Sequence, residues 1–350
     1  MKICQKTRIA RLRPGQVVAA NVVGDNHVLL NKGTVLTEPL IWKLMGWKEV
    51  EQVTVDAYDH DYAENLPEVN REMLQKYANT VSSVRSAFEA ARQLRSVPTA
   101  EMVVVAHSMI ENLVSHYAVL QALKLQERQG EYTFQHSVNV GILAGIIGKW
   151  LKYDAERLNE VVLAGVLHDI GKAQIPLDIL DKPGRLTQEE CMIMRKHTIY
   201  GYDLLKDMTD IPESIRFTVL QHHERLDGSG YPFSLTGDKI NDIAKIISVA
   251  DTYDAMTSER VYQTKRTPFA AVEVLEQDMF VKMDATVCLT VLNHLKESLV
   301  GNQVMMKDGR NAKIIQIGRQ GTEDLIVQTD DGEFINIGLR QHGLITSCDG

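Results

Sequence analysis

Hydrophobic and polar positions follow three different patterns along the chain, and each predicts a different kind of structure. In the first, short β-prone runs over residues 17–23 and 27–30 flank the turn residues Gly24-Asp25-Asn26. A helical pattern over 36–46 and a β-prone run over 50–55 come next. Residues 1–60 are therefore predicted to form a small mixed α/β module.

Helical patterns dominate residues 61–298. A long polar-rich helix is predicted over 62–94 and a second helix over 100–127, with a break near Pro98. Segments rich in glycine and proline divide the remaining helical patterns. We assign 61–127 to a helical connector and 128–298 to a helical core domain.

The period changes again after Val300. Asp308-Gly309 and Asp331-Gly332 each lie between β-prone runs, which is a strong signal for a β-hairpin. Residues 299–350 are therefore predicted to form a small β module. The expected fold class is mainly α, with small β-containing modules at both ends.

Composition and charge narrow the class of protein. A hydrophobic content of 44% and a charged content of 24% are ordinary for a soluble globular chain. No run approaches 18 apolar residues, and the basic start lacks the apolar segment of a secretory signal. The four cysteines are scattered, which favours free thiols in the cytoplasm. A net charge of −8 argues against a DNA or RNA polymer as partner.

Six stretches rich in histidine and aspartate carry the chemistry of the chain. Neutral imidazole and carboxylate bind divalent metals such as Fe, Mn and Zn. Their number exceeds what one tetrahedral ion needs and suits a two-metal site, the arrangement used to hydrolyse phosphate esters. The residues are His136, His168-Asp169, His197, His222-His223, Asp251 and Asp254.

Each stretch also has an ordinary structural interpretation. A lone histidine on an apolar helix is usually a hydrogen-bonded core residue, and a His-Asp pair is more often a surface or capping feature. These interpretations fit any one stretch and fit the whole set poorly. Burial of His168-Asp169 without a partner would be costly, and the adjacent imidazoles of His222 and His223 suit a metal-bound, neutral state.

Two residues near these stretches are candidates for contact with an anionic substrate. Lys172 follows His168 by four residues and could bind a phosphate oxygen or the leaving group. Tyr231 ends a glycine-rich loop that follows His223 and could line a base-stacking pocket. The alternatives are a solvated lysine and an ordinary turn.

The motifs taken together resemble the HD-GYP family, a branch of the HD superfamily that hydrolyses cyclic di-GMP. The resemblance covers about residues 132–295 and includes both halves of the family pattern in order. Its elements are HDIGK at 168–172, His197 with Gly201, HHERLDGSGYP at 222–232 and ADTYDAMTSER at 250–260. The resemblance implies an HD-type helical bundle as the catalytic domain over 128–298.

The resemblance also implies roles for individual residues. It implies catalytic roles for Asp169 and Lys172, with Asp169 bridging two metal ions. It implies substrate contacts from Lys172, Tyr231 and Arg260. The implied metal ligands are His136, His168, Asp169, His197, His222, His223 and Asp251.

Two positions depart from the family pattern. Tyr132 occupies the position at which some members carry a glutamate for a third metal, so we expect two divalent ions. Gln263 occupies a position at which members often carry a basic residue. Fe or Mn is the expected metal, and the ligand set also accommodates Zn, Ni or Co.

The expected function is metal-dependent hydrolysis of cyclic di-GMP to pGpG and/or GMP in bacterial second-messenger signalling. The alternatives are hydrolysis of another dinucleotide, such as cyclic GMP-AMP or pGpG, and a weakly active ligand-binding adaptor. A cytoplasmic enzyme without a membrane partner is expected. The apolar spacing of Leu74, Tyr77, Val81 and Val84 suits a homodimer through the helices of 62–127, or packing against the chain's own core.

Overall fold

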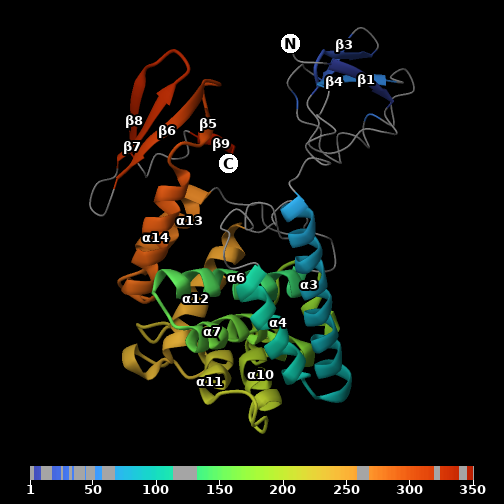
Figure 1. The fold of residues 1–350 in the computed structure, drawn as a ribbon, viewed down its shortest axis with the longest axis vertical. Helices are drawn as coiled ribbons and strands as arrows, with labels where there is room; N and C mark the ends of the chain where they lie inside the picture. The colour runs from blue at the N-terminus through green and yellow to red at the C-terminus, as the bar shows by residue number, and fades with distance from the viewer. Residues whose placement is uncertain are drawn as a thin grey trace. The chain divides into compact units, whose positions relative to one another are not determined.

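The computed structural model divides the chain into two compact units, Met1–Leu74 and Gln75–Gly350, which we describe separately (Figure 1). The boundary falls inside helix α3 (Glu68–Leu94). The structure describes residues 4–8, 18–24, 27–30, 34, 44, 52–56, 68–112, 132–257, 268–318, 324–338 and 345–349.

The N-terminal unit contains two antiparallel strand pairs. Strand β1 (Cys4–Arg8) pairs with β4 (Gln52–Asp56), and β2 (Val22–Gly24) pairs with β3 (His27–Leu30). The β-prone runs predicted over 27–30 and 50–55 are thus confirmed, and the run predicted over 17–23 is confirmed as a strand at its end, in β2. The predicted helix over 36–46 lies outside the described residues apart from Leu44.

Helices α3 and α4 (Thr99–Asn112) confirm the two predicted helices where they are described, and residues 62–67 and 113–127 lie outside that description. Tyr77, Val81 and Val84 on α3 are almost fully buried within the chain. Of the two interpretations of this spacing, packing against the chain's own core is the one seen for these three residues.

Helices α6 (Tyr132–Trp150), α7 (Ala155–Leu167) and α12 (Asp242–Thr257) form the centre of the core domain. Thirteen residues of α6 are buried, as expected of a helix that is apolar on all sides. Glycines bring α6 and α7 close together, because a Cβ atom on Gly165 would lie only 2.7 Å from Cα of Gly141.

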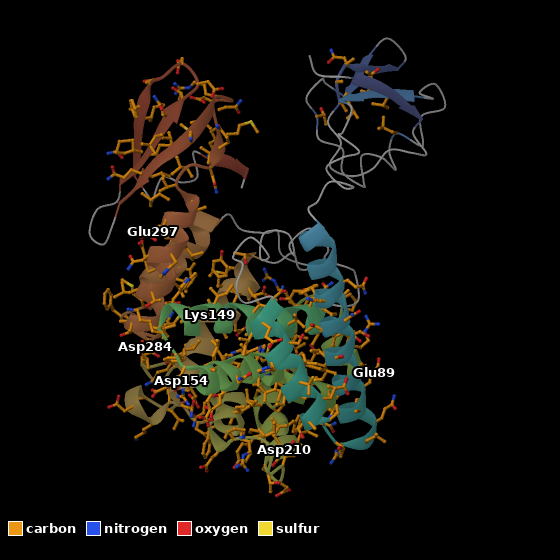
Figure 2. All side chains as sticks on the ribbon, in the orientation of Figure 1. Glu89, Lys149, Asp154, Asp210, Asp284 and Glu297 are labelled. Atoms are coloured by element: carbon orange, nitrogen blue, oxygen red, sulfur yellow. The ribbon has the colours of Figure 1, made fainter. Side chains whose placement is uncertain are left out.

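The remaining helices surround this centre. Asp154 and Asp284, labelled in Figure 2, accept backbone hydrogen bonds at the N-termini of α7 and α14, which is the usual role of aspartate at this position. The other elements are η2 (Ile170–Gln174), α8 (Leu177–Leu180), α9 (Gln188–Arg195), α10 (His197–Leu205), α11 (Glu213–Gln221), η3 (Gly237–Lys239), α13 (Pro268–Asp278) and α14 (Ala285–Leu299).

An antiparallel sheet of strand order β8-β7-β6-β5-β9 follows α14. Both predicted hairpins are present, and Gly309 and Gly332 take φ values of +86° and +89° in their turns, which glycine adopts without strain. The strands are β5 (Gln303–Met306), β6 (Asn311–Ile317), β7 (Asp324–Thr329), β8 (Phe334–Gly338) and β9 (Ile345–Asp349).

The mainly α fold with small β-containing parts at both ends is confirmed. The described helices include none that is both long and apolar enough to cross a bilayer.

Candidate metal centre

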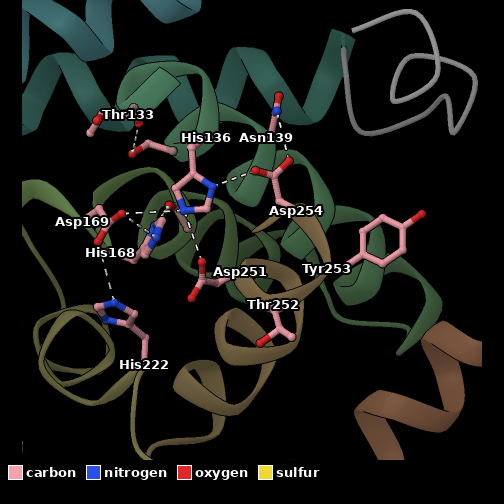
Figure 3. Close-up of polar contacts among 12 residues, drawn as sticks. Thr133, His136, Asn139, His168, Asp169, His222, Asp251, Thr252, Tyr253 and Asp254 are labelled. Atoms are coloured by element: carbon pink, nitrogen blue, oxygen red, sulfur yellow. Dashed lines mark hydrogen bonds and ion pairs between the residues drawn. The ribbon is translucent and has the colours of Figure 1, made fainter. Parts of the chain in front are cut away.

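The candidate ligands come from five helices or from the residues that follow them, so that segments far apart in the sequence meet at one point (Figure 3). His136 is in the first turns of α6, and His197 begins α10. His168 follows the last residue of α7, and His222 follows the last residue of α11. Asp251 comes from the second half of α12. All seven predicted metal ligands are brought together.

The backbone at the His-Asp pair differs from the geometry expected from a continuous helix. Helix α7 ends at Leu167, and Asp169 has φ −102° and ψ 7°, outside the helical region. The departure from helical geometry directs the carboxylate of Asp169 toward the same point as the imidazole of His168.

The seven side chains form two groups. Within each group, the candidate ligand atoms all lie within 4.8 Å of one another. Oδ1 of Asp169 lies 3.3 Å from Nε2 of His197, and Oδ2 lies 3.7 Å from Nε2 of His136. The two oxygens of one carboxylate thus face the two groups, as a bridging ligand would require. The groups are Asp169, His197, His222 and His223, and His136, His168 and Asp251.

Two polar atoms at this point are buried without a hydrogen-bond partner among the described residues: Nε2 of His168 and Oδ1 of Asp169. A buried polar atom left unsatisfied typically costs about 1–3 kcal/mol. Coordination of a cation would satisfy both atoms, and nitrogen and carboxylate oxygen are the donors that first-row divalent metals accept. The residues present therefore fit a metal site.

Three of the histidines are oriented by the backbone. The Nδ1 atoms of His168, His197 and His222 donate to the carbonyl three residues earlier, at 2.7, 2.8 and 2.9 Å. Donation from Nδ1 leaves Nε2 unprotonated in the neutral ring and directs it toward the centre. Each imidazole is thereby prepared as a metal ligand before any ion arrives.

His136 is oriented by a carboxylate instead. Its Nδ1 donates to Oδ2 of Asp254 at 2.7 Å, and the amide of Asn139 donates to Oδ1 of Asp254 at 3.1 Å (Figure 3). The hydroxyl of Tyr77 on α3 donates to Oδ1 of Asn139 at 2.9 Å. The sequence placed Asp254 among the candidates and missed Asn139, although Asn139 lies one helical turn after His136.

Burial keeps three imidazoles neutral. It lowers the pKa of His197 to about 4 and lowers the pKa of His222 and of His223 well below the usual value. A metal binds the neutral imidazole, so a low pKa reduces competition from protons at neutral pH.

The carboxylates of the centre remain charged in spite of burial. Burial raises the pKa of Asp169, but Lys172 and His168 outweigh it and hold that pKa well below its usual range. Burial also disfavours the charged form of His136 and so lowers its pKa. Hydrogen bonds with Asp251 and Asp254 outweigh this effect and raise the pKa of His136 to about 9. The centre without metal thus retains anionic carboxylates that attract cations.

Lys172 lies beside the bridging carboxylate. Its Nζ donates to Oδ2 of Asp169 at 2.5 Å, and its side chain is 23% exposed. Arg92 on α3 donates to the backbone carbonyls of Lys172 and Ile175, which fixes the turn that carries the lysine. The ammonium group is therefore close to the ligand atoms and accessible from solvent.

The glycine-rich loop places Tyr231 against the centre. The ring of Tyr231 stacks on His223 with 4.7 Å between ring centroids, and the guanidinium of Arg195 lies 5.1 Å from the centroid of Tyr231. Burial raises the pKa of Tyr231 above its usual value, so its hydroxyl is protonated at neutral pH. Arg260, the third predicted substrate contact, lies outside the described residues.

A buried carboxylate holds this loop in place. The two oxygens of Glu224 accept hydrogen bonds from the backbone amides of Phe233 and Leu235, at 2.7 and 2.9 Å. Gly230 permits the close approach, since a Cβ atom there would lie 2.4 Å from Cα of Glu224. Glu224 adjoins His223 in the same motif, but its role was not predicted from the sequence.

Comparison with known proteins agrees with this architecture. Residues 109–287 match the HD domain family. A cyclic di-GMP phosphodiesterase of Pseudomonas aeruginosa is 30% identical over 283 residues, 73% of this chain and 68% of that protein. A 3'3'-cGAMP-specific phosphodiesterase of Vibrio cholerae is 30% identical over 199 residues, 57% of this chain and 42% of that protein.

A solved structure supports the fold. A HDG"Y"P protein from Bdellovibrio bacteriovorus matches with a TM-score of 0.55 and 17% identity, over 84% of this chain and 100% of that chain. The matched family covers just over half of the chain, and the Pseudomonas relative extends the match beyond it. The chain therefore belongs to the HD-domain family, in the HD-GYP branch of the cyclic di-GMP phosphodiesterases.

Proposed function

We propose that this protein is a metal-dependent phosphodiesterase that hydrolyses cyclic di-GMP to pGpG and/or GMP. The observation that carries the proposal is the pair of ligand groups that meet at the two oxygens of Asp169. Two adjacent divalent ions supply a nucleophile derived from water and neutralise charge on a phosphodiester, which is the chemistry of this reaction.

The ligands divide between the two ions as the two groups do. His136, His168 and Asp251 would hold one ion. His197, His222 and His223 would hold the other, with Asp169 shared by both. Fe or Mn fits this mixture of imidazole and carboxylate, which also accommodates Zn, Ni or Co.

The residues beside the ligands would act on the substrate. The ammonium of Lys172 lies next to the shared carboxylate and would donate to a phosphoryl oxygen as negative charge develops there. Tyr231 would contact the substrate from the loop above His223. Arg260 would supply a further cation, as the family resemblance implies.

The test measures turnover by protein that has been loaded anaerobically with Fe or Mn. Cyclic di-GMP, 3'3'-cGAMP and pGpG are assayed as separate substrates, and the products are identified by chromatography. Cyclic di-GMP is expected to react fastest. A higher specificity constant for 3'3'-cGAMP would favour the alternative that the Vibrio relative suggests. Binding of cyclic di-GMP without turnover under any metal would indicate an adaptor.

A homodimer through residues 62–127 stays a prediction. The buried stripe of Tyr77, Val81 and Val84 is already used within the chain, so a dimer needs another surface of these helices. Val104 on α4 is such a surface residue, with 68% of its area exposed. Light scattering that shows a monomer at micromolar concentration would contradict the dimer.

A further inference from the structure

The cationic side chains around the metal centre and the loop of Tyr231 differ in the partners to which their N–H groups donate hydrogen bonds. Lys172 donates to Asp169, and Arg92 donates to two backbone carbonyls. Arg225 donates to the carbonyls of His222 and Glu224 and to the hydroxyl of Ser248. These three cations hold the site together.

Arg195 is different. Within the part of the chain that the structure describes, its guanidinium makes no hydrogen bond or ion pair, and its contact is with the face of the Tyr231 ring. It is the last residue of α9, two positions before His197, and its side chain is exposed. A guanidinium has five N–H donors in a planar fork, and none of the described residues accepts a hydrogen bond from them.

The position of Arg195 is on the accessible side of the centre. His136, His168 and His222 are buried, whereas the side chains of His223 and Lys172 are 20% and 23% exposed. Tyr231 packs on His223, and Arg195 packs on Tyr231. A substrate that reaches the ligand atoms from the side of His223 therefore passes beside the guanidinium.

The proposed substrate needs a cation at some distance from the ions. A cyclic dinucleotide carries two phosphodiester groups, one on each side of its ring, and only one can occupy the metal centre. The other keeps its negative charge in the field of a chain whose net charge is −8. A guanidinium binds such a group through two parallel hydrogen bonds.

We propose that Arg195 binds the phosphate of the cyclic dinucleotide that is not being cleaved. The proposal rests on the proposed function. Tyr231 holds the guanidinium beside the exposed edge of His223 through the cation–π contact, so the donors are positioned before the substrate arrives.

The experiment measures kcat and KM of metal-loaded wild type, Arg195→Gln and Arg195→Lys with cyclic di-GMP and with 3'3'-cGAMP. Loss of charge-assisted hydrogen bonds should raise KM on the order of 10- to 100-fold in Arg195→Gln. The smaller ammonium of Arg195→Lys should give an intermediate KM. Metal content should equal that of wild type. Arg310→Gln removes the same charge from the C-terminal sheet, where Arg310 pairs with Asp308 and Glu333, and serves as the control.

The two substrates carry the same phosphates and differ in one base, so the increase in KM should be equal for both. KM should also depend less on salt in Arg195→Gln than in wild type, because a charged contact is gone. An unchanged KM, an increase confined to one substrate, or an unchanged salt dependence would each overturn the proposal; the last would make Arg195 only a support for Tyr231. Wild type without turnover or binding of any cyclic dinucleotide would refute the proposed function itself.

Discussion

Asp169 holds the centre together at the scale of single residues. Its two carboxylate oxygens face the two ligand groups, and its buried Oδ1 has no hydrogen-bond partner among the described residues. Around it, the backbone orients His168, His197 and His222, and Asp254 orients His136. The metal ligands, the groups that orient them and the cation beside them can therefore be tested separately.

Replacement of Asp169 by alanine should abolish turnover and lower the metal content, because both candidate ions lose a shared ligand. Metal analysis and an assay in excess metal measure the two effects. Asp203→Ala is a suitable control, since this exposed carboxylate lies on the same helix as His197 and pairs only with Lys206 among the described contacts. Full activity of Asp169→Ala would contradict a dinuclear centre.

Lys172→Ala should retain the metals and lose catalysis. The loss of one preorganised donor at the phosphoryl oxygens typically lowers the rate on the order of 100- to 1000-fold. Lys172→Arg, which retains the positive charge, should recover part of the rate. If Lys172→Ala loses as much metal as Asp169→Ala, the lysine serves instead to stabilise the bridging carboxylate.

Asp254→Ala should weaken metal binding without removing a ligand. Asp254 fixes the ring of His136 through Nδ1, and loss of such an orienting carboxylate typically lowers metal affinity about 10- to 100-fold. Excess metal should therefore restore much of the activity, unlike in Asp169→Ala. Asp242→Ala at the exposed start of α12 is the control. Equal metal affinity in wild type and Asp254→Ala would refute this role.

At the scale of elements, close backbone packing sets the distances between ligands. A Cβ atom on Gly171 in η2 would lie 1.9 Å from the carbonyl oxygen of His197 and 2.4 Å from the backbone nitrogen of Gly201. A Cβ atom on Gly201 would instead meet a side-chain atom of Val219 at 2.6 Å. The turn that follows Asp169 thus lies directly against the helix that carries His197.

Gly171→Ala should consequently be more destabilising than Gly201→Ala. The second change crowds a side chain, which typically costs about 1–3 kcal/mol, whereas the first requires two backbone segments to separate. Thermal denaturation of the metal-free proteins compares the two. A transition midpoint for Gly171→Ala at or above that of Gly201→Ala would show that η2 and α10 can move apart easily.

At the scale of the whole molecule, the metal centre joins helices that begin or end far apart in the sequence, so its charges bear on global stability. The buried histidines oppose one another in this respect. Burial lowers the pKa of His197 to about 4, whereas hydrogen bonds with Asp251 and Asp254 overcome burial and raise the pKa of His136 to about 9.

The metal-free protein should be most stable slightly above pH 6.5, the usual pKa of histidine, because the pKa is lowered in three buried histidines, His197, His222 and His223, and raised in His136. Between pH 6.5 and about pH 4, His197 is protonated in the unfolded chain but neutral in the folded protein. The free energy of unfolding therefore falls on acidification. Above pH 6.5 the stability contributed by protonated His136 is lost progressively toward pH 9. Denaturation midpoints in a chelator from pH 4 to 9 test this, and His197→Gln should flatten the acid limb. A midpoint independent of pH would contradict it.

Much of the fold and of the site could be predicted from sequence. Periodicity predicted α3, α4 and the strands near 22–30, and the two Asp-Gly pairs predicted the C-terminal hairpins. The residue types and order in HDIGK and HHERLDGSGYP predicted the metal chemistry and the family. Such features follow from local backbone preferences and from the ligand chemistry of single side chains, which the sequence states directly.

Other features were decided only by tertiary structure. The sequence could not indicate that Tyr77 and Asn139 support Asp254, that Glu224 fastens the loop of Tyr231, or that Arg195 lies over its ring. It also left open whether the apolar stripe of α3 faces a partner or the chain's own core. Each depends on contacts between separate segments of the chain, and the periodicity of one segment does not encode which side chain of another segment it meets.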